Sequence, residues 1–213
     1  MRGRWARSER SATPEEASQI TQVLGLEQPG FWTAVQADAV TTARFRGEHH
    51  RFRNRLDAAV QVVRLCVVTD AFLAQVAYRA RVRCRGVGIP LVPWLLHRVS
   101  VVSGQLSIGD YAVLRPGIYI PHGQVVIDGL TLVESGVALR PFVTLGLIDG
   151  HIFGPTLGAG ALIGTGAKVV GPVHIGQGAN IGANAVVVDD VPAHATAVGV
   201  PARAISPPAA GDA

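Results

Sequence analysis

Apolar residues return at every sixth position through the second half of the chain. An aliphatic residue stands at 127, 133, 139 and 145, and the series continues at 157, 163, 169, 175, 181 and 187. A small or β-branched residue follows four positions after most of them, as at Val137, Ala161 and Ala185. Neither an α-helix nor a hairpin strand has a period of six, but a coil with three flat sides does. The pattern therefore predicts a parallel β-helix of triangular section, with one hexad on each side and the aliphatic residues stacked inside.

Glycines come directly after several of the inward residues, at Gly158, Gly164, Gly176 and Gly182. We expect a side chain to be poorly tolerated at these positions. A flexible linker rich in glycine and alanine would not place an aliphatic residue at every sixth position. The repeat therefore predicts a folded solenoid that begins near Leu106.

The first half of the chain has the pattern of helices. Thr13-Pro14-Glu15-Glu16 is a helix start, with threonine as the cap and proline at the first helical position. A second helix is expected over 31–46, and a third, longer one from Arg55 to Arg85 with Gly86 as its stop. A short helix around 94–102 completes this half.

These patterns divide the chain of 213 residues into three parts. We expect an α-helical N-terminal domain over 1–104, the solenoid over 105–205 and a disordered tail over 206–213. Charged residues interrupt the apolar stretches and no apolar run follows the start, so neither a membrane span nor a signal peptide is predicted. Cys66 and Cys84 fall in the helical half and are expected to be reduced thiols of a cytoplasmic protein.

The net charge of +4 comes from the first half, which holds most of the arginines. A basic surface can bind nucleic acid or an acidic membrane. Here the arginines are spread over several predicted helices without interleaved aromatic residues. We therefore interpret them as solvated helix faces and expect no nucleic-acid or membrane partner.

One histidine stands where the repeat breaks. Counting sixes from the inward Ile120 predicts the next inward residue at 126, but the next well-matched hexad starts at Ile127. His122 lies beside the extra residue, and imidazole is the side chain best suited to proton transfer near neutral pH. From spacing alone, a functional histidine and a surface turn histidine are both open.

The segments with the most specific sequence read VTLG at 143–146, PTLGAGALIGTGAKVVGPVHIGQGANIGANAVVVDDVP at 155–192 and AVGVPAR at 197–203. Together with the helical approach from about residue 70, they resemble the hexapeptide-repeat acyltransferases, and within them the serine O-acetyltransferases. The resemblance implies a left-handed β-helix that transfers the acetyl group of acetyl-CoA directly to L-serine, for cysteine biosynthesis. It implies no metal and no covalent enzyme intermediate.

The resemblance also implies roles for individual residues. His122 matches the general base of the family. The family's aspartate partner, fifteen residues upstream, is replaced by Ser107, which can orient an imidazole but cannot stabilise the imidazolium as a carboxylate would. Asp110 and Asp128 are two candidate replacements.

In the family, coenzyme A runs along a groove between neighbouring solenoids and bonds to small-residue corners. The matching positions here are Gly146, Thr165, Gly166, Ala167 and Ala183, with Lys168 and Arg203 placed to meet the phosphates or the adenine. The serine-binding loop of the family carries a histidine where this chain has Gly154. His151, three residues earlier, is the candidate for substrate binding.

The sequence leaves other functions open. The acceptor hydroxyl or amine can belong to a sugar or a specialised metabolite, since Ser107 and Gly154 depart from the family pattern. A metal hydratase of the carbonic anhydrase type on the same solenoid would need three converging histidines, and His122, His151 and His174 lack the usual spacing. A non-catalytic scaffold is the third alternative.

The resemblance further implies assembly into a homotrimer, or into a hexamer through the helical half. The final residues read GDA, without the isoleucine tail with which members of the family dock onto a sulfhydrylase. We therefore expect no such complex through the tail.

Overall fold

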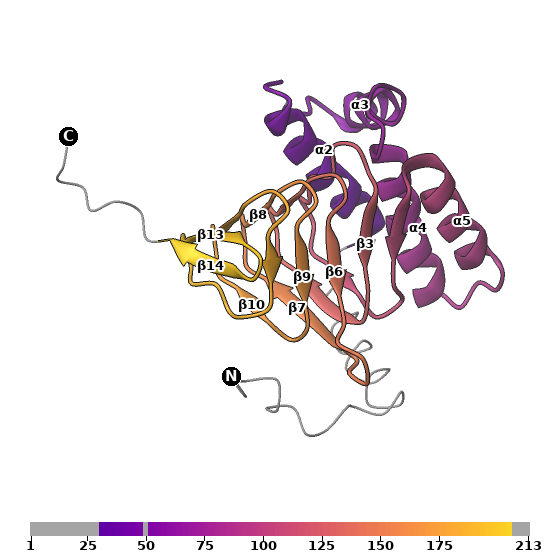
Figure 1. Ribbon diagram of the computed structural model, residues 1–213. Helices are drawn as coiled ribbons and strands as arrows, with labels where there is room; N and C mark the ends of the chain where they lie inside the picture. The colour runs from indigo at the N-terminus through magenta and orange to yellow at the C-terminus, as the bar shows by residue number, and fades with distance from the viewer. Residues whose placement is uncertain (1–29, 49–50, 206–213) are drawn as a thin grey trace.

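The computed structural model describes residues 30–48 and 51–205. Helices come first in the described part of the chain and pack at one end of a stack of parallel coils (Figure 1). The predicted start at Thr13–Glu16 and the tail over 206–213 lie outside the described residues. The helices are α2 (Phe31–Phe45), α3 (Arg55–Val68), α4 (Phe72–Gly86) and α5 (Val92–Gly104).

The strands wind into three sheets, one on each side of the coil, which we name A, B and C. Sheet A has β1 (Leu106–Ile108), β3 (Val125–Ile127), β6 (Thr144–Gly146), β9 (Lys168–Val170) and β12 (Val186–Val187). Sheet B has β2 (Val113–Leu114), β4 (Leu130–Val133), β7 (Phe153–Leu157) and β10 (His174–Ile175). Sheet C has β5 (Ala138–Leu139), β8 (Leu162–Ile163), β11 (Asn180–Ile181), β13 (Thr196–Gly199) and β14 (Ala202–Ile205). Each strand pairs in parallel with the strand one coil away, and a final antiparallel hairpin joins β13 to β14.

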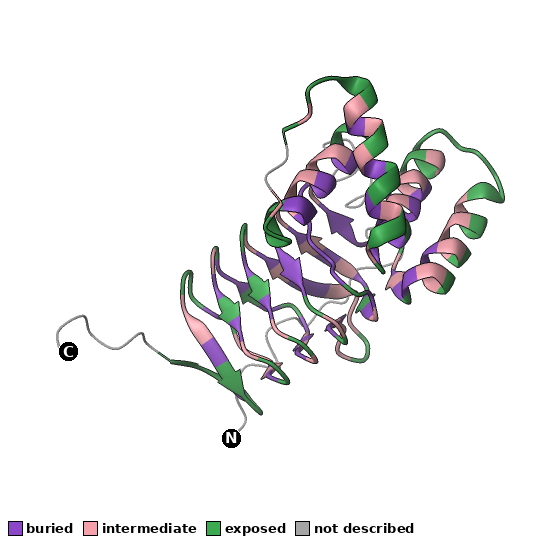
Figure 2. Cartoon of the chain, turned by 90° about the horizontal axis from the view of Figure 1, so that it is seen from above, coloured by how far each residue is buried: buried purple, intermediate pink, exposed green. Residues whose placement is uncertain are grey.

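The predicted six-residue period is confirmed in the solenoid core. Every inward aliphatic residue from Ile127 to Val187 is at most 1% exposed, and Figure 2 shows the buried positions along the coils. Burying one such side chain contributes about 1.5–3 kcal/mol relative to leaving it in water. Because each coil buries its interior only against its neighbours, the stack as a whole provides the stability.

The glycines that follow the inward residues are packed against the next coil. A Cβ on Gly158 would lie 2.6 Å from the backbone nitrogen of Gln177, and a Cβ on Gly164 would lie 2.6 Å from the carbonyl oxygen of Ile181. Neither neighbour is a flexible side chain that can move aside. The expectation that side chains are poorly tolerated at these two positions is thus confirmed.

The prediction of one long helix from Arg55 to Arg85 is wrong. The segment forms two helices, α3 and α4, because Thr69 adopts an extended conformation with φ −127° and ψ 139°. Its hydroxyl donates a hydrogen bond of 2.6 Å to the carbonyl oxygen of Leu65, which closes the last turn of α3. The break places Asp70 between the two helices. The helix predicted over 31–46 is confirmed as α2, and the one around 94–102 is longer, as α5.

The helices are joined to the first coils by apolar and polar contacts. Ala71, Ala74 and Tyr78 of the α4 region belong to the same buried cluster as the solenoid interior. Gln75 donates a hydrogen bond of 2.9 Å to the carbonyl oxygen of Ile118. A separate cluster, formed by Val35, Ala39, Val62, Leu65 and Phe72, holds α2, α3 and α4 together.

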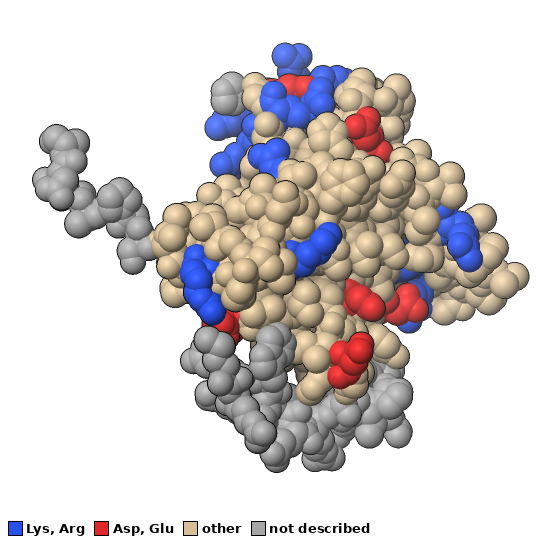
Figure 3. All heavy atoms as spheres, viewed as in Figure 1, with Lys and Arg blue, Asp and Glu red and all other residues tan. Residues whose placement is uncertain are grey.

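Charge is distributed unevenly over the surface. Figure 3 shows lysine and arginine atoms gathered over the helices at the top of the view, while the middle of the molecule is mostly uncharged. Exposed arginines of this region include Arg44, Arg53 and Arg64. None of the helices in the described ranges has the length and apolar character that crossing a bilayer requires.

Candidate functional site

His122 stands at a sharp corner of the first full coil, between Pro121 and sheet A. Gly123 and Gln124 both have left-handed backbone conformations, with φ of 73° and 56°, so the chain turns tightly here. The corner is packed on the end of α5, where Gln124 donates its backbone N–H to the carbonyl oxygen of Gly104 at 3.0 Å. A Cβ on Gly123 would lie 1.7 Å from that oxygen, so only glycine fits. This packing fixes the backbone that carries the imidazole.

The imidazole of His122 is paired with a carboxylate from the helical half. Its Nδ1 lies 2.8 Å from Oδ2 of Asp70, in the break between α3 and α4. A carboxylate can only accept, so Nδ1 carries the hydrogen, and in the neutral ring Nε2 is then an acceptor. The two side chains are 63% and 73% exposed, so the ring is open to a substrate. The arrangement is suited to a general base.

The strand register places several of the expected site residues on one edge of the prism. Tyr119 pairs with Ala138, Ala138 with Leu162, and Leu162 with Asn180. Three residues after each of these positions come His122, Pro141, Thr165 and Ala183, one per coil. We call this column of corners the His122 edge. It also carries Phe142, an exposed aromatic residue with φ 64°, which no repeat or motif in the sequence marks as part of a site.

Thr165 and Gly166 lie on this edge and the side chain of Ala167 is buried in the core behind it, so both the glycine and the alanine have a structural reason to be small. Gly166 has φ 74°, and a Cβ there would lie 2.0 Å from Oδ1 of Asn184. Gly146 differs, because it lies at the far end of β6, on the next edge, and the nearest atom to its Cβ position is 3.6 Å away. The small size of Gly146 is therefore not required by packing.

The two basic residues expected near the cofactor are both engaged. Lys168 Nζ donates to the carbonyl oxygen of Phe142 at 2.6 Å and to Oγ1 of Thr144 at 3.0 Å. It is the first residue of β9, at the end of sheet A that adjoins the His122 edge. Arg203, on β14, pairs with Asp189 at 3.3 Å and is 68% exposed. Lys168 is held close to the edge by two hydrogen bonds, whereas Arg203 stands at the C-terminal hairpin with a largely exposed side chain.

The loop between β6 and β7 contains His151. Its backbone N–H bonds to the carbonyl oxygen of Ile148 at 3.0 Å, and its Nδ1 is buried without a hydrogen-bond partner in the described part of the chain. Gly154 is buried in β7, where a Cβ would lie 2.1 Å from Oγ1 of Thr131. A histidine cannot stand at 154 in this conformation. His151 is on the edge that Gly146 begins and is not joined to His122.

Neither Ser107 nor either of the two candidate carboxylates, Asp110 and Asp128, is hydrogen-bonded to His122 in the described part of the chain. Ser107 faces outward on β1, opposite Val126, and its hydroxyl makes no hydrogen bond among residues 30–48 and 51–205. Asp110 pairs with Arg85 at 2.5 Å, and Asp128 accepts the backbone N–H of Gly129 at 2.7 Å. None of the three is the partner of His122 that the structure describes.

Neither a metal cluster nor a disulfide is present in the described ranges. No group of three or more histidine, cysteine, aspartate or glutamate side chains is placed there to hold a metal ion. Cys66 and Cys84 are free thiols and half-buried. Burial raises the pKa of Cys66, which keeps that thiol protonated at neutral pH.

The chain is similar to proteins of known family. Residues 154–189 match the family described as bacterial transferase hexapeptide (six repeats). The structure superposes on the soybean serine acetyltransferase apoenzyme with a TM-score of 0.65 and 31% identity, over 81% of this chain and 69% of the soybean chain. The chain belongs to the hexapeptide-repeat transferases.

Within the family, this hexapeptide-repeat transferase is similar in sequence and structure to serine acetyltransferases. It is 40% identical over 124 residues to the serine acetyltransferase of Salmonella typhimurium, which is 55% of this chain and 44% of that protein. The chain thus spans less than half of that relative's length. A serine acetyltransferase in complex with CoA superposes with a TM-score of 0.65 and 27% identity, over 90% of this chain and 73% of the other.

Proposed function

We propose that the chain is an acetyl-CoA-dependent O-acetyltransferase with L-serine as the acceptor. The observation that carries the proposal is the imidazole of His122, exposed at the end of an edge that contains small residues. The similarity to serine acetyltransferases, one of them in complex with CoA, supports both the acyl donor and the acceptor.

His122 acts as the general base in this proposal. Its Nε2 takes the proton of the acceptor hydroxyl as the oxygen attacks the carbonyl carbon of the acetyl thioester. The new C–O bond forms, the C–S bond breaks, and the imidazolium returns its proton to the departing CoA thiolate. The products are the acetyl ester and CoA, and no group remains on the protein.

The His122 edge is where we place the pantetheine arm of acetyl-CoA. Thr165 and Ala183 present short, exposed side chains there, and Phe142 offers an exposed aromatic face, whereas the methyl group of Ala167 is buried in the core and leaves only its backbone to approach. Lys168 and Arg203 supply positive charge toward the phosphates and the adenine. Gly146 would allow a close approach on the neighbouring edge.

Direct transfer is favoured over an acyl-cysteine intermediate. A thiolate, and not a thiol, is the nucleophile. The raised pKa of Cys66 disfavours its thiolate, and that residue lies on α3, in contact with the buried cluster of the helices. Turnover is therefore expected to survive the change of both cysteines to serine.

Release of free thiol from acetyl-CoA tests the function. With L-serine present we expect steady release of CoA, and we expect His122→Ala to lower turnover by about a hundredfold or more. Near-normal turnover in that variant would exclude His122 as the base. Addition of a chelator is expected to leave the rate unchanged.

A second candidate is acetyl transfer to a hydroxyl or amine of another small molecule. It is favoured by Gly154, because the position that matches the substrate-binding histidine of the family cannot hold any side chain here. His151 then remains as the candidate contact to the acceptor. A panel of sugars and amino alcohols beside L-serine distinguishes the candidates, since release with one of them alone would move the function to it.

We also propose that the chain assembles as a homotrimer or as a hexamer and acts in the cytoplasm. Light scattering of the purified protein tests the assembly. A monomeric mass would contradict a site that is completed between neighbouring solenoids.

A further inference from the structure

We propose that Asp70 is the residue that positions His122 for catalysis, in place of the carboxylate that is missing at position 107. This inference rests on the proposed function and deepens it. It assigns a role to the helical part of the chain, because Asp70 lies between α3 and α4 while His122 lies on the solenoid.

The contact has the geometry of a charge-assisted hydrogen bond. The distance of 2.8 Å between Nδ1 of His122 and Oδ2 of Asp70 lies in the range for an N–H group bonded to a carboxylate. The bond selects the tautomer with the hydrogen on Nδ1. The lone pair on Nε2 then faces away from Asp70, so the nitrogen that must accept the proton is the one left open.

Both ends of the contact are held by their backbones. Asp70 begins the turn into α4, directly after Thr69 closes α3. Gly104, at the end of α5, is packed against Ala71, since a Cβ there would lie 3.3 Å from the Ala71 Cα, and against the corner at Gly123. The end of α5 therefore bridges the two segments, and the pair does not depend on the meeting of two long, mobile side chains.

The other carboxylates near the first coils are committed elsewhere. Asp110 forms an ion pair with Arg85, and Asp128 accepts the backbone N–H of Gly129. Asp38 is buried and bonded to Arg79. Asp70 has His122 as its only ion-pair partner among the described residues.

The energy of the pair in the absence of substrate is small, because both side chains are largely exposed and water screens their charges. Its effect is therefore expected on turnover and not on stability. During the reaction His122 becomes positively charged, and a carboxylate beside Nδ1 stabilises that state while it holds the ring in place. A serine at 107 cannot supply this charge.

Two substitutions of Asp70 and one control test the role. Asp70→Asn keeps the shape but removes the charge, and its amide can donate to Nδ1 and so favour the wrong tautomer. We expect it to lower kcat on the order of tenfold or more, with the KM for acetyl-CoA unchanged. Asp70→Glu restores a carboxylate and should recover part of the loss. Asp110→Asn, which removes a carboxylate bonded to Arg85, should keep wild-type kcat.

Nitrogen NMR of labelled histidine gives a readout that a merely structural role would not change. Wild-type protein should show His122 protonated on Nδ1, and Asp70→Asn should increase the Nε2-protonated form. Wild-type kcat in Asp70→Asn, or an equal loss in Asp110→Asn, would overturn the assignment. If His122→Ala retains turnover, the proposed function fails; if only the Asp70 variants retain it, the positioning role alone fails.

Discussion

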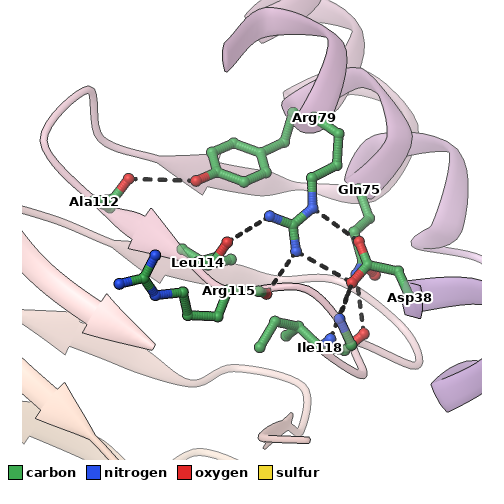
Figure 4. Close-up of polar contacts among 9 residues, drawn as sticks. Asp38, Gln75, Arg79, Ala112, Leu114, Arg115 and Ile118 are labelled. Carbon is green, nitrogen blue, oxygen red and sulfur yellow. Dashed lines mark hydrogen bonds and ion pairs between the residues drawn. The ribbon is translucent and has the colours of Figure 1, made fainter. Parts of the chain in front are cut away.

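Asp38 and Arg79 form a buried ion pair that ties two helices to the first coils of the solenoid. Oδ2 of Asp38 on α2 lies 2.9 Å from Nε of Arg79 on α4, and the side chains are 1% and 4% exposed (Figure 4). Oδ1 of Asp38 also accepts the backbone N–H groups of Gly117 and Ile118. Arg79 donates to the carbonyl oxygens of Leu114 and Arg115. Burial alone would lower the pKa of Arg79, but Asp38 raises it and keeps the guanidinium charged.

Removal of one member of this pair should destabilise the protein strongly. We expect Asp38→Ala to lower the free energy of unfolding by about 3–5 kcal/mol, because it leaves a buried guanidinium without its counter-ion. Asp189→Ala, which breaks the exposed contact with Arg203, should cost less than about 1 kcal/mol. Urea unfolding of the two variants checks the difference.

Replacing both members with apolar residues should not restore stability. Many buried ion pairs can be exchanged for apolar side chains at little cost. Here the backbone groups of Gly117, Ile118 and Leu114 would lose their partners in the Asp38→Leu/Arg79→Met variant, and an unsatisfied buried group costs about 1–3 kcal/mol. A double variant as stable as the wild type would show that these backbone bonds contribute little.

Gly146 and Gly166 should respond differently to a methyl group. Gly166→Ala places a Cβ on a residue with φ 74° and against Asn184, so we expect a loss of stability of about 1–3 kcal/mol. Gly146→Ala has room for its Cβ, and its free energy of unfolding should differ from that of the wild type by less than about 0.5 kcal/mol. If acetyl-CoA passes close to Gly146, the KM for acetyl-CoA rises in this stable variant. An unchanged KM would remove Gly146 from the cofactor site.

The solenoid could be predicted because the sequence pattern that specifies each coil is local and is repeated many times. A single hexad is weak, but ten inward positions in one register leave no competing period, and each proved to be buried. The helical half lacks such redundancy. Val67 and Val68 carry the apolar pattern up to the break, and Ala71 and Phe72 resume it directly afterwards, so the two helices are easily taken for one. The Thr-Asp pair, typical of a helix start, was the available signal.

The two residues of the proposed acid–base pair also differ in how far the sequence could predict them. His122 could be found because it interrupts a strict repeat. Asp70 lies 52 residues away in sequence, and its contact with His122 depends on how α4 and α5 pack on the first coil. A search along the chain for a carboxylate near Ser107 finds Asp110 and Asp128, which the fold uses elsewhere. Only tertiary structure could supply this partner.

Arg203 should affect binding of acetyl-CoA more than turnover. Its side chain is exposed and only loosely paired, so it can turn toward a phosphate. We expect Arg203→Ala to raise the KM for acetyl-CoA by about threefold or more at low ionic strength, with less effect at high salt. Arg98→Ala, on α5, is the control and should leave the KM unchanged. Equal KM values for wild type and Arg203→Ala at low salt would contradict the role.

His97 should make the stability of the protein depend on pH near neutrality. Arg81 donates to its Nδ1 at 2.8 Å, and since arginine cannot accept, that nitrogen carries no hydrogen. Burial, together with the charge of Arg81, lowers the pKa of His97 below its ordinary value of 6.5. Below that pH the unfolded chain binds a proton that the folded histidine resists. The stability is therefore retained above 6.5 and declines as the pH falls below it.

His97→Gln removes this titration while its amide oxygen can still accept from Arg81. We expect the urea midpoint of the wild type to fall more steeply than that of His97→Gln between about pH 7.5 and about pH 5.5. Other titrating groups contribute equally to both proteins, so the difference between the two curves isolates His97. Parallel curves would mean that His97 takes up its proton as easily in the folded protein as in the unfolded chain.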